Sequence, residues 1–102
     1  MGFEYQVNCN KEVTPADFAG IVEILSRQIA CVVTKQIGDV AQFKWKNSIV
    51  GEGWESDIEI ENKTSSIFVL FSSASQQQQN SFLSCLLKEL EERENQCSLE
   101  EL

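Results

Sequence analysis

Residues 57–71 read DIEIENKTSSIFVLF, and this stretch decides the fold class. Ile58 and Ile60 alternate with acidic residues, which is the period-two pattern of a half-buried strand. Asn62-Lys63-Thr64 has the composition of a turn, and residues 65–73 contain the longest unbroken apolar run of the chain. Two strands joined by so short a turn are expected to pair in antiparallel fashion.

The pattern extends outward from this hairpin. Residues 3–9 and 40–46 also alternate between apolar and polar side chains, so each is expected to form a strand. A helix is expected from Thr14, where Thr14 can cap and Pro15 suits the first helical position. A second helix is expected after Ser75, which forms a capping-box pattern with the glutamine run, although a flexible polar linker is the alternative there.

The end of the first helix is ambiguous. Residues 29–34 are rich in β-branched side chains, so they could form a strand that leads into a hairpin at Gly38-Asp39. No helix breaker precedes Gly38, and Lys35 suits a last helical turn, which favours a helix to about residue 35. We therefore predict a helix here and keep the strand as the alternative.

The predicted element order is strand, helix, three strands, helix. It indicates an α+β fold, a two-layer sandwich in which two helices cover a mainly antiparallel sheet of about four strands. Residues 1–94 are expected to form a single domain. Residues 95–102 are polar and acidic, and we expect them to be a flexible tail.

Negative charge is concentrated in the second half of the chain. The 102 residues carry 16 acidic and 8 basic side chains, which gives a net charge of −8. Residues 1–51 are neutral, so residues 52–102 hold the whole excess. Nucleic acids and anionic membranes are bound through basic patches, and no such patch is visible, so we expect neither partner. The absence of a membrane-length apolar run and of a signal-peptide pattern favours a cytoplasmic protein.

The sequence contains no histidine, which excludes Ser-His-Asp and Cys-His catalysis. No spacing of other residues indicates a catalytic site, a cofactor or a metal. The cysteines form no closely spaced pair, which argues against a zinc site. We expect reduced thiols, most of them in the core, with Cys97 the most exposed. The cysteines are Cys9, Cys31, Cys85 and Cys97.

Acidic residues at alternate positions between residues 55 and 61, in and beside the strand predicted there, form the first candidate site. Alternate residues of a strand share one face, so these carboxylates are expected to point outward and to meet a basic protein partner. The alternative is that they pair across strands with Lys44 and Lys46. This acidic stripe comprises Glu55, Asp57, Glu59 and Glu61.

The loop Gly51-Glu52-Gly53-Trp54 is the second candidate. Tryptophan is enriched at interface hot spots, so Glu52 and Trp54 are predicted to contact the partner. The alternative is that Trp54 folds back over the edge of the core.

Phe68 and Leu70 are the third candidate. They point away from Ile67, Val69 and Phe71, so the strand has large apolar residues on both faces. With both helices on one face, Phe68 and Leu70 are predicted to form a dimer or docking patch, unless the tryptophan loop covers them.

These features predict a small acidic protein-binding module without catalytic activity. It would bind a protein partner, with a basic surface as the favoured case, as an inhibitor, an immunity-type factor or a chaperone. Immunity-type inhibitors of toxins and small secretion chaperones share this size and charge, which is a likeness of composition without a motif. The alternative is a small-molecule-binding or enzymatic domain with a pocket between sheet and helices, lined by Tyr5, Cys9 and Trp45.

Overall fold

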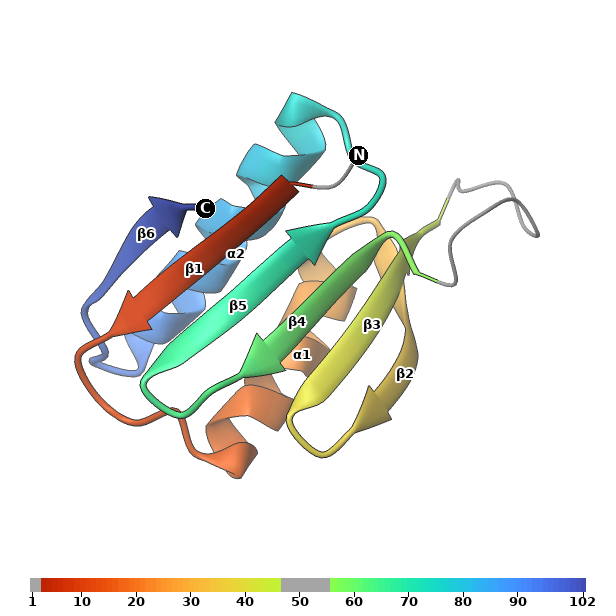
Figure 1. Cartoon of the computed structure of the whole chain (residues 1–102). Helices are drawn as coiled ribbons and strands as arrows, with labels where there is room; N and C mark the ends of the chain where they lie inside the picture. Colours follow the sequence, from red (N-terminus) through yellow and green to blue (C-terminus); the bar gives the residue numbers. More distant parts are fainter. Residues whose placement is uncertain (1–2, 47–55) are drawn as a thin grey trace.

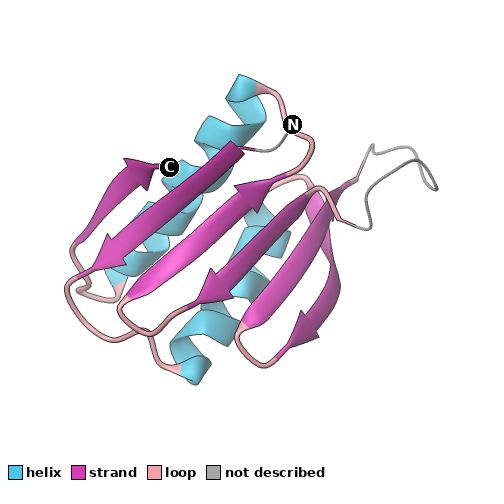
Figure 2. Ribbon diagram, in the orientation of Figure 1, coloured by secondary structure: helices cyan, strands magenta, loops and turns pink. Residues whose placement is uncertain are grey.

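Six antiparallel strands form one sheet in the order β2-β3-β4-β5-β1-β6, and two helices cover one of its faces (Figures 1 and 2). The computed structural model describes residues 3–46 and 56–102, and the element counts refer to those residues. The chain therefore has the α+β fold class that its sequence predicts. The strands are β1 (Phe3–Cys9), β2 (Cys31–Ile37), β3 (Val40–Trp45), β4 (Ile58–Asn62), β5 (Ser66–Phe71) and β6 (Cys97–Glu101), and the helices are α1 (Pro15–Gln28) and α2 (Gln76–Glu92).

The three consecutive strands β3, β4 and β5 pair in antiparallel fashion, as the hairpin pattern predicts. Burial along β4 follows the period of two, because Ile58 and Ile60 are fully buried whereas Glu59 and Glu61 are partly exposed. The same alternation holds along β3 and β5. One face of the sheet is therefore apolar and packs against the helices.

Both helices begin where the capping residues indicate. The Thr14 side chain accepts a hydrogen bond from the backbone N–H of Asp17, with Pro15 in the first turn. Ser75 and Gln78 form a reciprocal capping box, so the glutamine run begins α2 and the linker alternative is wrong. Within the described part of the chain, neither helix has the length and apolar character needed to cross a membrane.

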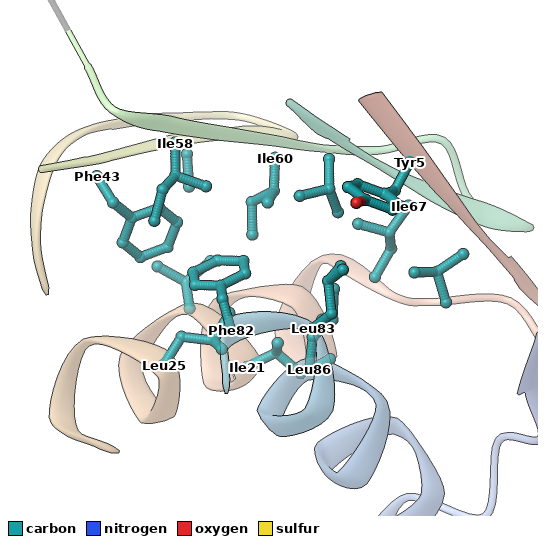
Figure 3. Close-up of a cluster of buried hydrophobic side chains, with 14 of the residues drawn as sticks. Tyr5, Ile21, Leu25, Phe43, Ile58, Ile60, Ile67, Phe82, Leu83 and Leu86 are labelled. Carbon is teal, nitrogen blue, oxygen red and sulfur yellow. The ribbon is translucent and has the colours of Figure 1, made fainter. Parts of the chain in front are cut away.

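The core lies between the sheet and the two helices (Figure 3). Three phenylalanine rings meet edge to face at its centre: the ring centroid of Phe82, from α2, lies 5.5 Å from that of Phe43 and 5.6 Å from that of Phe71. Ile21 and Leu25 of α1 pack beside them and are fully buried. Side chains of the sheet and of both helices thus meet in this space.

The predicted helix to about residue 35 is wrong beyond Gln28. Ile29 has an extended backbone (φ −104°, ψ 146°), and β2 then pairs with β3. The chain reverses at Gly38, whose φ of +57° is a conformation that glycine adopts without steric cost. The strand alternative is therefore confirmed: β-branched side chains suit a strand, and β3 supplies backbone hydrogen bonds that a continuing helix would leave unused.

The sheet has six strands instead of about four because the C-terminal residues also join it. In place of the expected flexible tail, β6 pairs with β1. Asn95, just before β6, connects this segment to Lys11, just after β1. Its side-chain oxygen accepts from the backbone N–H of Lys11 (2.9 Å), and its side-chain nitrogen donates to the Lys11 carbonyl (3.0 Å). Backbone hydrogen bonds to β1, more than apolar burial, hold these polar residues in the sheet.

Candidate functional site

Phe68 and Leu70 lie on the face of the sheet opposite the helices. They are partly exposed, whereas Ile67, Val69 and Phe71 between and beside them are fully buried against the helices. The outward direction that the alternation predicts is confirmed. Among residues 3–46 and 56–102, no helix lies over this face (Figure 1). We call it the open face, and its outward side chains include Glu4, Gln6, Val40, Gln42, Lys44, Glu59, Glu61, Phe68 and Leu70.

Carboxylates flank the two apolar residues on the neighbouring strands. Leu70 lies directly between Glu4 of β1 and Glu59 of β4. Phe68 lies between Gln6 and Glu61 in the same way. Side chains directly opposite one another in an antiparallel sheet have Cβ atoms about 4.5–5.5 Å apart. Each apolar side chain therefore lies beside the side chain of at least one glutamate.

A hydrogen bond and a ring contact hold this arrangement in place. The Gln42 side-chain nitrogen donates to the Glu59 carboxylate at 2.8 Å. The Lys63 ammonium lies 5.5 Å from the centre of the Phe68 ring. The residues directly opposite Glu59 and Glu61 on β3 are Gln42 and Val40, and Lys44 lies two residues from Gln42 on the same face. Glu59 and Glu61 are thus positioned on a strand inside the sheet, with ordered neighbours on both sides.

Asp57 does not belong to the outward stripe, so its predicted orientation is wrong. Its side chain is buried, with 4% of the residue exposed, and one carboxylate oxygen accepts from the backbone N–H of Trp45 at 3.0 Å. The residue precedes β4, and its backbone bonds to Phe43 and Ser72. Asp57 therefore completes the hydrogen bonding where β3 and β5 end and β4 begins, and the alternation of β4 starts only at Ile58.

Replacing Asp57 with alanine is expected to lower the free energy of unfolding by about 1–3 kcal/mol, because the buried N–H of Trp45 then loses its acceptor. Asp57→Asn keeps an oxygen at this position and should lose less. Glu61→Ala on the open face is the control and should change stability by less than about 0.5 kcal/mol. Urea unfolding followed by tryptophan fluorescence measures all three. Equal losses for Asp57→Ala and Glu61→Ala would contradict the assigned role.

The structure adds residues to the open face that the sequence did not single out. Glu4 and Gln6 come beside the apolar pair because β1 inserts between β5 and β6, which no local pattern indicates. Val40 opposite Glu61, and Ile37 opposite Val40, extend the apolar surface toward β2. The predicted contact residues Glu52, Trp54 and Glu55 lie outside the described residues, so the loop that contains them is not placed here.

Two of the three residues proposed to line a ligand pocket border hollows: Cys9 borders one of about 420 Å³, and Trp45 borders one of about 290 Å³. Tyr5 is buried and donates from its hydroxyl to the Gln79 side chain at 2.9 Å, and the Trp45 ring nitrogen donates to the Ser73 carbonyl at 2.6 Å. A hollow of about 940 Å³ lies beside the end of α2 and the start of β6. Its lining is mostly polar and comprises Asn10, Leu87, Glu91, Glu94, Asn95, Gln96 and Cys97.

In residues 3–46 and 56–102, no three Cys, Asp or Glu side chains gather in a way that could hold a metal ion. Comparison with protein-family models, with curated proteins and with solved structures found no match to this chain.

Proposed function

We propose that the chain is a protein-binding module without catalytic activity, and that its open face binds a basic, partly apolar segment of a protein partner. One observation carries the proposal: Leu70 lies between the carboxylates of Glu4 and Glu59 on the two neighbouring strands, and Phe68 beside it lies opposite Glu61 on one side and Gln6 on the other. A pair of large apolar side chains on a face without a covering helix can be buried by a partner, and the flanking negative charge favours a basic one.

The two kinds of side chain would have different roles in binding. Burial of Phe68 and Leu70 contributes affinity, at about 25 cal/mol for each Å² of apolar surface removed from water. The carboxylates contribute selectivity and association rate, because they attract a basic surface from a distance and repel an acidic one. The negative charge of the whole chain, −8, adds to the same attraction.

A basic partner is favoured over a second copy of the chain. In a two-fold symmetric dimer, each residue of the patch meets the same patch on the other copy. Pairing of two open faces would bring the carboxylates of Glu4, Glu59 and Glu61 close to the same group of carboxylates on the other copy, and like charges brought together cost free energy. Size-exclusion chromatography with light scattering over a concentration series checks this, and we expect a monomer. Dimerisation that Leu70→Ser abolishes would favour the homodimer instead.

A titration with a designed peptide tests the proposed function. We expect a short peptide of alternating lysine and leucine to shift the amide signals of β4 and β5 in NMR spectra of the ¹⁵N-labelled chain. Replacing both Glu59 and Glu61 with glutamine should weaken binding about fivefold, as expected for the loss of two exposed charge contacts. The loss should shrink as salt rises from about 0.01 M to about 0.1 M, because the screening length falls from about 30 Å to about 10 Å.

A variant of equal charge provides the control. Glu12→Gln combined with Glu23→Gln removes two exposed carboxylates that lie away from the open face, and peptide binding should be nearly unchanged. A glutamate-leucine peptide of the same length should not bind. Signals that shift mainly around the hollow beside α2, or equal weakening in both charge variants, would contradict the proposal.

A further inference from the structure

Two cysteines from opposite ends of the chain face each other across neighbouring strands. Cys9 ends β1 and Cys97 begins β6, and the register places the two residues directly opposite one another. Both belong to the alternating set that points toward the helices, with Val7 opposite Leu99 as the next pair on that face. Both are free thiols and both are partly buried.

The backbone hydrogen bonds identify the kind of pair. The N–H of Asn10 donates to the Gln96 carbonyl at 3.0 Å, so Asn10 and Gln96 form a hydrogen-bonded pair of the antiparallel ladder. Pair types alternate along such a ladder, and the adjacent pair, Cys9 and Cys97, is therefore of the non-hydrogen-bonded type. Cα atoms of such pairs lie about 4.5 Å apart, which is inside the range of about 4.4–6.8 Å that a disulfide spans.

The two thiols can also be reached from outside. A hollow of about 420 Å³ is lined by both cysteines, and Cys97 in addition lines the larger hollow beside α2. The remaining cysteines differ, because Cys31 is fully buried and donates to the Leu25 carbonyl, and Cys85 lies on α2 beside Gln28. Geometry and access together distinguish the pair Cys9 and Cys97 from the other thiols.

We propose that Cys9 and Cys97 form a redox modification site, which reacts with the disulfide of a small thiol compound and closes into a reversible bond that fastens β6 to β1. Cys97, which lines both hollows, attacks first: its thiolate displaces one small thiolate and forms a mixed disulfide. The Cys9 thiolate then attacks the Cys97 sulfur and displaces the second. The two protein sulfurs are oxidised, the small disulfide is reduced to two thiols, and these take up the two protons that the cysteines release.

The second step sets the speed of closure. Burial raises the pKa of Cys9 to about 12, and hydrogen bonding to the Cys97 thiol beside it contributes. Little Cys9 thiolate is then present at neutral pH. As long as the pH is below the pKa, the thiolate fraction grows about tenfold for each unit by which the pH is raised. Closure should therefore be slow near pH 7 and faster in alkaline solution. This site does not depend on the binding function proposed above.

Oxidised glutathione is the probe that tests the site. After incubation of the full chain with it, mass spectrometry should show the loss of two hydrogens without a glutathione adduct, and proteolysis should yield a peptide containing Cys9 linked to one containing Cys97. The thermal midpoint of the oxidised chain should rise by about 10 °C, since the bond closes a loop of most of the chain. Reduction by dithiothreitol should reverse both changes.

Two variants make the result specific. Cys31→Ser with Cys85→Ser should oxidise as the unmodified chain does. Cys9→Ser should stop at a mixed disulfide on Cys97. The proposal is overturned by a chain that stays reduced at alkaline pH, by a stable glutathione adduct on the unmodified chain, or by a link that involves Cys31 or Cys85. A thermal midpoint that does not change on oxidation would overturn the claim that the bond fastens β6.

Discussion

Replacing Phe82 with alanine is expected to lower the free energy of unfolding by about 3–5 kcal/mol. Phe82 is fully buried and connects the two layers, because its ring from α2 meets the Phe43 ring of β3 and the Phe71 ring of β5 edge to face. Its removal deletes apolar surface and both ring contacts, and it leaves a cavity that the surrounding strands and helices can close only in part. Equilibrium urea unfolding by circular dichroism measures the loss.

Phe68→Ala is the matched control, since it removes the same side chain from the open face. Phe68 is partly exposed, so its loss should cost about 1 kcal/mol or less. If Phe82→Ala leaves too little folded protein for measurement, Phe82→Leu retains most of the apolar surface and should be less destabilised. A cost for Phe82→Ala no greater than that for Phe68→Ala would show that the aromatic cluster is not the centre of the core.

Replacing Arg93 with alanine is expected to cost about 3 kcal/mol. Arg93 donates to the Glu89 carboxylate at 3.0 Å, and its guanidinium nitrogen lies 3.9 Å from a carboxylate oxygen of Asp17 on the other helix. The Glu89 side chain is only 6% exposed, so the variant leaves a buried carboxylate without its cation. Thermal and urea unfolding at neutral pH should both report the loss.

A second substitution separates loss of charge from loss of packing. Glu89→Gln in the Arg93→Ala background removes the buried charge, and most of the stability should return. Arg27→Ala is the control, because its partner Glu23 and Arg27 itself are both well exposed, and such pairs contribute about 0.3–0.5 kcal/mol. A double variant as unstable as Arg93→Ala alone would contradict the charge argument.

The strands of the central hairpin could be predicted because their signal is local. Ile58 and Ile60 alternate with glutamates, and a period of two places alternate side chains on opposite faces whatever the neighbouring strands are. The beginnings of both helices follow from Thr14 and Ser75, whose side chains bond to backbone N–H groups three residues away. Interactions that span only a few residues can therefore be predicted from the sequence alone.

Part of the candidate site could also be predicted from the sequence. The alternation along β4 and β5 predicted that Glu59, Glu61, Phe68 and Leu70 point away from the helices, and they do. It could not predict that Glu4 completes the acidic border, because that depends on which strand pairs with β5. For Asp57, the same alternation predicted the wrong direction, since the residue serves the backbone of a different strand.

By itself, the sequence determined the α+β class, the helix starts, the antiparallel order of β3, β4 and β5 and the two faces of these strands, because each of these depends on neighbours close in the chain. Only the tertiary structure decided that residues 31–37 and 97–101 are strands. The β-branched run of β2 favours a strand, but no helix breaker separates it from α1, and the polar residues of β6 favour neither structure. Pairing with the backbone groups on the edges of β3 and β1 therefore decides both segments. That same pairing brought Cys97 opposite Cys9 and Glu4 beside Leu70.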